Sequence, residues 1–160
     1  MDNLLDKEAV KRVQKSLNSF DDTLKVQVLE QSARTAKDAA IALKCEVGAI
    51  VKSLLLRSED DFILCLVSGD KKCSLNKVKK LTGKKDVCMA NAEDVKKKTG
   101  FTIGGVSPVG LANKLEIMID DKLNRFQDIF AAAGHPYVVF KIDFKNLKEI
   151  TKGVILDISE

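Results

Sequence analysis

The residue with the clearest chemical potential in this 160-residue sequence is Lys52. It interrupts an apolar run, residues 49–57, whose aliphatic composition is typical of a β-strand. Because side chains alternate between the two faces of a strand, Lys52 shares one face with Ile50, Leu54 and Leu56. An ammonium on such a face either extends past its edge into water or points into a cavity to meet an anion or a carbonyl oxygen. Both interpretations stay open at this point.

The second candidate is the uncharged segment 101–110, which reads Phe-Thr-Ile-Gly-Gly-Val-Ser-Pro-Val-Gly. Glycines let a backbone approach a ligand closely, and proline stiffens a loop. Successive N–H groups of such a loop could cradle an anion or an oxyanion, although a plain structural turn explains the same composition. The candidate catalytic residues are therefore Lys52, Gly104, Gly105, Ser107 and Pro108.

The usual catalytic sets are missing from the sequence. A Ser-His-Asp or Cys-His arrangement needs a histidine base, and the single histidine, His135, falls in a predicted turn. There is no Gly-x-Ser-x-Gly elbow, no Gly-x-Gly-x-x-Gly fingerprint and no Walker A loop. The four cysteines include no Cys-x-x-Cys pair, which favours reduced thiols over a zinc site or a disulfide framework. We expect neither a metal nor another cofactor.

Charge is distributed unevenly, although the net charge is only +4. Residues 71–85 hold seven lysines and no acidic residue, which suits a phosphate backbone and equally suits a solvated helix face. A general DNA- or RNA-binding protein is disfavoured, because seven Phe, one Tyr and no Trp, mostly in core-like positions, offer no stacking platform. No stretch is long and apolar enough to span a bilayer, and no secretory signal is visible, so we expect a cytoplasmic protein.

The elements that must position these residues are interleaved irregularly. We predict helices at 6–18, 36–43, 75–81, 92–98 and 144–150, and strands at 24–29, 49–57, 61–68, 87–90, 117–119, 126–133, 137–142 and 154–158. Thr35 is the predicted N-cap of the second helix. Several strands occur as adjacent pairs, which favours antiparallel neighbours. The sequence thus predicts one α+β (mixed α/β) domain over residues 1–160, with a curled, barrel-like mixed sheet surrounded by helices.

Seven short motifs occur in a recognisable order. They are Ser-Ala-Arg-Thr at 32–35, Ile-Val-Lys-Ser-Leu at 50–54, Ser-Gly-Asp at 68–70, Thr-Gly at 99–100, Gly-Gly-Val-Ser-Pro-Val-Gly at 104–110, Ile-Asp at 119–120 and Ala-Gly at 133–134. In this order, over residues 20–158, they resemble the YbaK/ProX family, the aminoacyl-tRNA editing domains related to the insertion domain of bacterial prolyl-tRNA synthetase.

The resemblance implies a mixed, barrel-like fold and a metal-free hydrolase without a protein nucleophile. It implies that Lys52 is the family's lysine and that residues 104–108 are its Gly-x-x-x-Pro loop. The implied substrate is a tRNA, most often proline tRNA, that carries a wrong small amino acid such as alanine or cysteine. Because such an ester is already activated, the enzyme must mainly position it and stabilise charge. Lys52 would contact the carbonyl or a terminal phosphate, while water, a ribose hydroxyl or the substrate side chain attacks.

The other motif residues are implied to bind the substrate: Arg34, Ser53, Ser68, Gly69, Val106, Asp120, Ala133 and Gly134. The 3′ end and acceptor stem of the tRNA would meet the basic segment through Lys71, Lys72, Lys77, Lys79 and Lys80. Residues 132–137 lack the Gly-Lys-Arg-Gly-like stretch of cysteine-selective relatives, which favours the branches directed at alanine and other small residues. Prolyl-tRNA synthetase is an implied partner. The alternative is a non-catalytic module of the same fold that binds tRNA or a synthetase.

Overall fold

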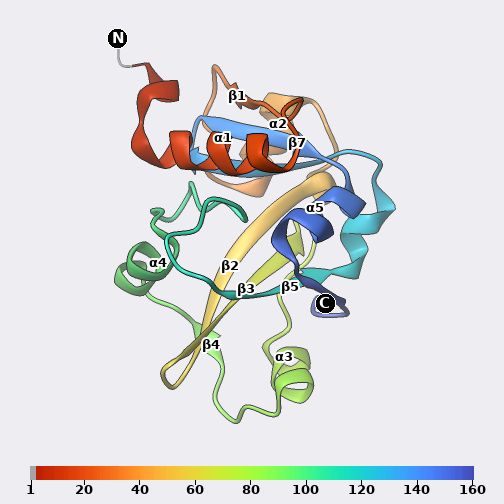
Figure 1. Ribbon diagram of the computed structural model, residues 1–160. Helices are drawn as coiled ribbons and strands as arrows, with labels where there is room; N and C mark the ends of the chain where they lie inside the picture. Colours follow the sequence, from red (N-terminus) through yellow and green to blue (C-terminus); the bar gives the residue numbers. More distant parts are fainter. Residues whose placement is uncertain (1–2) are drawn as a thin grey trace.

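The computed structural model describes residues 3–160, which build one mixed β-sheet of eight strands (Figure 1). In spatial order the strands are β1 (Val26–Val28), β7 (Val138–Ile142), β6 (Ile129–His135), β2 (Ile50–Ser58), β3 (Asp61–Ser68), β5 (Glu116–Asp120) and β8 (Val154–Leu156). The short strand β4 (Cys88–Met89) pairs with β2 outside this path. The mixed sheet with surrounding helices is confirmed. The sheet is not a closed barrel, because β1 and β8 at its two ends do not pair with each other.

The sheet contains antiparallel and parallel pairs. β2 and β3 make a hairpin whose register runs from Val51 opposite Ser68 to Ser58 opposite Asp61, and β6 and β7 also pair antiparallel. Two further antiparallel pairs, β1 with β7 and β2 with β4, join strands that are not consecutive in the sequence. The parallel pairs are β2 with β6, β3 with β5, and β5 with β8. The sheet is therefore mixed because hairpins supply its local pairs and longer connections supply the others.

Five α-helices cover the sheet: α1 (Glu8–Phe20), α2 (Ala36–Leu43), α3 (Leu75–Thr82), α4 (Ala92–Thr99) and α5 (Phe144–Thr151). Thr35 caps α2, since its hydroxyl accepts a hydrogen bond from the Asp38 N–H at 3.1 Å. Gly83 and Gly100 end α3 and α4 at φ values of 72° and 80°, which glycine adopts without strain. None of the helices formed by residues 3–160 is long and apolar enough to cross a membrane.

Alternation along β2 divides the hydrophobic core between the two faces of the sheet. Leu55 packs in the larger cluster, with residues of α1 and α5, while Leu56 packs in a second cluster that contains Val78 of α3. A small third cluster forms where Ile50 meets α2. Lys52 lies on the same face as Ile50, Leu54 and Leu56, as the alternation of strand side chains predicts.

Candidate active site

A cavity of about 340 Å³ lies beside the central strand β2. On this side of β2, β6 pairs with Ile50 and Val51, and β4 pairs with Leu56 and Arg57. Among residues 3–160, no strand is paired with the stretch between these two contacts on this side, and the cavity follows that unpaired edge. Its walls come from residues of α2, β4, α4, β6 and the loop at 103–106, and most of them are apolar.

Main-chain polar groups also border the cavity. The Leu55 carbonyl accepts a hydrogen bond of 2.9 Å from the Ala90 N–H, so the peptide groups of Leu55 point toward this edge. Peptide groups two positions apart along a strand point the same way. The N–H and C=O of Ser53 are therefore directed into the gap between β6 and β4. A ligand in the cavity would meet one main-chain donor and one main-chain acceptor there.

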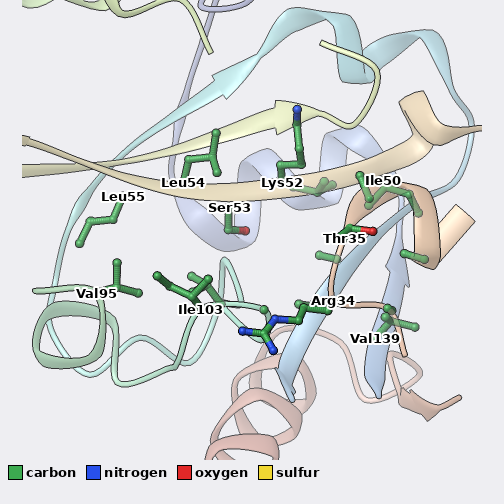
Figure 2. A pocket seen from close by; sticks show the side chains of 18 of the residues that line it. Arg34, Thr35, Ile50, Lys52, Ser53, Leu54, Leu55, Val95, Ile103 and Val139 are labelled. Atoms are coloured by element: carbon green, nitrogen blue, oxygen red, sulfur yellow. The ribbon is translucent and has the colours of Figure 1, made fainter. Parts of the chain in front are cut away.

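The hydroxyl of Ser53 faces the same space. Figure 2 shows it directed from β2 toward the region occupied by Ile103 and Arg34. Within residues 3–160, Ser53 Oγ is the one buried side-chain oxygen or nitrogen without a hydrogen-bond partner. Buried polar groups are almost always paired in folded proteins, so an unpaired hydroxyl at a cavity indicates a place for a ligand atom.

The ammonium of Lys52 is turned the other way. Figure 2 shows it on the side of β2 opposite Ser53 and Ile103, and Nζ donates a hydrogen bond to the Lys71 carbonyl. Burial lowers the pKa of Lys52, while the carboxylates of Asp70 and Asp120 act in the opposite direction. Lys52 still lines the cavity, because the cavity lies along the strand edge and touches residues of both faces. In this structure the ammonium does not converge with residues 104–108.

Gly104 and Gly105 in the 101–110 segment permit a close approach to the backbone, but the groups that approach belong to the protein itself. Gly104 has φ 98°, and a Cβ there would lie 2.9 Å from Cγ of Arg34. At Gly105 a Cβ would lie 2.8 Å from the main-chain nitrogen of His135. The Gly105 N–H donates to the Thr102 carbonyl at 3.0 Å, so this group is already used within the turn.

The structure separates the loop residues that were grouped together as catalytic. Gly104 and Val106 line the cavity. Ser107 is fully buried and its hydroxyl accepts from the Val109 N–H at 3.1 Å. Pro108 instead lines a different surface groove, between α1 and α5. Ser107 and Pro108 therefore maintain the loop and are not among the cavity-lining residues.

Ser68 and Asp120, which the motifs assigned to substrate binding, belong to a buried network outside the cavity. The fully buried Asp120 carboxylate accepts from the Ser68 N–H at 3.0 Å, the Lys122 N–H at 3.1 Å and the Ser159 hydroxyl at 2.9 Å. The Ser68 hydroxyl in turn accepts from Arg125 at 2.9 Å. These bonds fix the end of β3 to β5, because a buried carboxylate needs partners.

The structure gives packing reasons for three further motif residues, Gly69, Ala133 and Gly134. A Cβ on Gly69 would lie 2.2 Å from the Val47 carbonyl, and one on Gly134 would lie 2.9 Å from the Ala9 main chain. Ala133 is fully buried in the larger core cluster. None of the three lines the cavity described above, whereas Arg34 and Ser53 both do.

The predicted tRNA-binding lysines are spread over the segment after β3 and over α3. Lys77 is held in place, since its ammonium contacts the Asp157 carboxylate at 3.0 Å and the Ser159 carbonyl at 2.6 Å. Lys72 and Lys80 are exposed. A contact between any of these lysines and tRNA stays a prediction.

Several cavity residues carried no chemical signal in the sequence. They are ordinary apolar side chains that the fold brings together from distant segments: Met89, Val95, Ala131, Ala132 and Val139. Met89 and Ile103 are unusual in the structure, since they line the cavity and yet are 51% and 53% exposed. They therefore mark its mouth.

Comparison with known proteins agrees with the resemblance seen in the motifs. The sequence model described as "Aminoacyl-tRNA editing domain" matches residues 30–150. The uncharacterized protein YwhH of Bacillus subtilis is 35% identical over 127 residues, which are 79% of this chain and 80% of that protein. A solved structure described as a candidate trans-editing enzyme for prolyl tRNA synthetase has a TM-score of 0.90 at 39% identity, covering 96% of this chain and 98% of the other.

Much longer relatives match over one part of their length. The proline–tRNA ligase of Caldicellulosiruptor saccharolyticus is 28% identical over 127 residues, which are 79% of this chain but only 22% of the ligase. The chain thus spans about a fifth of that ligase, and the similarity concerns a single portion of it. With a family match over most of its length, a close structural neighbour and a cavity beside Lys52, this chain belongs to the aminoacyl-tRNA editing domain family.

Proposed function

We propose that this chain is a trans-acting aminoacyl-tRNA deacylase, which hydrolyses the ester of a mischarged small amino acid on tRNA, with proline tRNA as the carrier. The observation that carries the proposal is the apolar cavity at the unpaired edge of β2, into which the partnerless Ser53 hydroxyl points. In the reaction, water adds to the ester carbonyl and the bond to the ribose oxygen breaks. The products are the free amino acid and an uncharged tRNA.

The size of the cavity supports a small substrate group. A volume of about 340 Å³ is near the lower end of the range of roughly 300–1,000 Å³ that ligand pockets occupy. Such a space suits an aminoacyl group with its ribose, and it leaves the rest of the acceptor stem at the surface. Alanine side chains from α2 and β6 form part of the walls. One methylene more or less in the substrate changes binding in such a pocket by about 1–3 kcal/mol, so the limited volume decides which small side chain fits.

The proposed chemistry depends on positioning and charge, because an aminoacyl ester needs no further activation. Ser53 would hold the amino acid through its hydroxyl and through the peptide groups that face the gap between β6 and β4. When substrate binds, the Lys52 side chain would turn around the edge of β2 along which the cavity lies. Its ammonium would then release the Lys71 carbonyl and bind the ester carbonyl or a terminal phosphate instead. Arg34, exposed beside Gly104, would face the tRNA backbone, and the lysines of α3 would attract the acceptor stem.

The decisive experiment is a release assay with proline and alanine tRNAs carrying Ala, Cys, Ser or Thr. We expect rapid release of one small amino acid from one of these tRNAs, well above spontaneous hydrolysis. Retention of tRNA binding without release would instead support the non-catalytic module. Salt-dependent binding of unrelated RNA and DNA, again without release, would support a general nucleic-acid-binding protein.

Replacing Ser53 by alanine should lower deacylase activity and raise the free energy of unfolding. Because the hydroxyl has no partner in the free protein, its removal should stabilise the chain by about 1 kcal/mol. Loss of its contact with substrate should lower kcat/KM by roughly tenfold, equivalent to about 1.4 kcal/mol. Urea unfolding and deacylation kinetics measure the two effects. Ser58→Ala, on the same strand outside the cavity, is the control and should leave kcat/KM unchanged.

Replacing Ile103 by alanine should weaken substrate binding more than turnover. The half-exposed Ile103 and Met89 at the cavity mouth offer apolar surface to the terminal adenosine. Trimming one of them should raise KM by roughly fivefold, since a lost apolar contact of this size amounts to about 1 kcal/mol. Ile41→Ala, at a side chain 60% exposed on α2 and outside the cavity, should change neither constant. A fall in kcat alone would contradict this role.

A further inference from the structure

The side chain of Arg12, from α1, binds both ends of the cavity loop, residues 100–110. Its Nε donates a hydrogen bond of 3.1 Å to the Gly110 carbonyl, and its Nη2 donates one of 3.1 Å to the Gly100 carbonyl. The guanidinium carbon also lies 4.8 Å from the centre of the Phe101 ring. Figure 1 shows the loop that follows α4 passing below α1. One side chain from a helix far away in the sequence thus holds the two ends of this loop.

The packing between Arg12 and the cavity loop is close. A Cβ on Gly100 would lie 2.5 Å from Nη2 of Arg12, and a Cβ on Gly110 would lie 3.0 Å from the main-chain carbonyl of Arg12. Phe101 is 1% exposed and packs in the larger core cluster, which also contains Val13 of α1. Contacts as close as these leave the two ends of the loop little freedom to move relative to α1.

The middle of the same loop forms one wall of the cavity. Ile103, Gly104 and Val106 line this wall. Between its ends, the loop is joined to β6 through the Gly105 carbonyl, which accepts a hydrogen bond of 3.0 Å from the Gly134 N–H. Arg12 is not among the residues that line the cavity, so it can affect the cavity only through the loop.

We propose that Arg12 is a positioning residue of the candidate active site, which fixes the loop wall and thereby limits the size of the amino acid that the cavity accepts. This role rests on the proposed function, because it concerns the selectivity of deacylation. A fixed wall rejects a larger side chain by steric clash, whereas a wall that can move outward admits it. The helix that carries Arg12 lies outside residues 30–150, which match the editing-domain model.

Holding both carbonyls requires the forked donor group of arginine. A guanidinium presents its N–H donors in a fixed plane, whereas lysine carries its three donors on one atom at the end of a flexible stem. The Gly100 carbonyl also accepts from the Lys96 ammonium at 3.4 Å. Arg12→Lys therefore keeps the positive charge but loses the fork. The Gly110 end of the loop should be released first, because the Gly100 end keeps Lys96.

The first test compares the selectivity of deacylation in Arg12→Lys and Arg12→Met with that of the wild type. The ratio of kcat/KM for the preferred amino acid to kcat/KM for a larger one on the same tRNA should fall at least fivefold. Partial unfolding lowers both values by the same factor, so a purely structural role leaves the ratio unchanged. Lys11→Met, at an exposed residue of α1 outside the cavity, is the control and should keep the wild-type ratio. An unchanged ratio in both Arg12 variants would overturn the proposal.

The second test follows the loop itself, without substrate. Amide hydrogen exchange at Gly105 and Gly134 should be at least tenfold faster in Arg12→Lys, because their N–H groups bond to carbonyls of the loop. Leu66, which is fully buried in β3 and paired with β2 and β5, is the internal reference and should not change. Equal acceleration at Leu66, or none at Gly105, would overturn the clamp. If the wild type releases no amino acid, the proposed function fails, whereas hydrogen exchange still decides whether Arg12 holds the loop.

Discussion

Replacing Lys52 by methionine is expected to lower kcat for release of the mischarged amino acid by roughly 100-fold, the usual effect of removing one charge-stabilising group from an active site. Methionine keeps the length and apolar character of the lysine stem, so packing beside Leu54 should persist. What disappears is the ammonium, which is held by the Lys71 carbonyl alongside two carboxylates. Single-turnover deacylation measures the effect, and circular dichroism with thermal unfolding verifies the fold.

The matched control is Lys122→Met. Lys122 lies outside the cavity, and its ammonium contacts the carboxylates of Asp121 and Asp157. Its loss should leave kcat unchanged. Full activity in Lys52→Met would exclude the lysine from the reaction and leave Ser53 as the centre of the site. Loss of activity together with a large fall in thermal stability would assign Lys52 a purely structural role.

Local patterns in the sequence were sufficient to predict most elements of the fold. The apolar, β-rich run in 61–68 predicts β3 with the observed bounds, and Thr35 with Asp38 predicts the start of α2. Strand ends are less well predicted: 24–29 and 154–158 shrink to three residues each, because a strand extends only as far as its partner does. Whether the curled sheet closes could not be predicted from the sequence, because closure depends on which strands meet at its edges.

The candidate site was predicted in part. Lys52, Ser53, Arg34, Gly104 and Val106 all line the cavity, and the motifs had named each of them. The direction of the Lys52 ammonium could not be read from the sequence. The alternation of side chains along β2 predicts the face of the sheet on which Lys52 lies. Only the pairing of β2 with β6 and β4 shows where the edge of the strand is open.

Some polar residues of the motifs lie outside the cavity for a physical reason. Asp120 and Ser68 have the residue types of a binding site, but three hydrogen bonds bury the carboxylate between β3 and β5. Gly69 and Gly134 are glycines because another main chain comes too close for a Cβ. A motif thus contains structural and functional residues alike, and burial with satisfied partners distinguishes the structural ones.

Replacing Ala132 by phenylalanine is expected to block the cavity and lower kcat/KM by at least tenfold, which corresponds to about 1.4 kcal/mol of lost binding. Ala132 lies on β6 opposite Val139, lines the cavity and is half-buried. A benzyl group can therefore enter the cavity without displacing the core behind it. The blocked space is the one proposed to hold the amino acid. Deacylation of a mischarged tRNA should therefore fall by a larger factor than the affinity for uncharged tRNA. Filter binding and deacylation kinetics compare the two.

Ala42→Phe provides the matched control, since Ala42 is half-buried on α2 and lies outside the cavity. Both variants introduce the same side chain. A difference in their deacylation kinetics would therefore be due to the blocked cavity and not to the added volume. The free energy of unfolding of Ala132→Phe should lie within about 1 kcal/mol of the wild-type value, because aromatic residues are favourable in β-strands. Equal deacylation by both variants would place the amino acid elsewhere. The free edge of β2 would then need a different ligand to explain why the hydroxyl of Ser53 is buried without a hydrogen-bond partner.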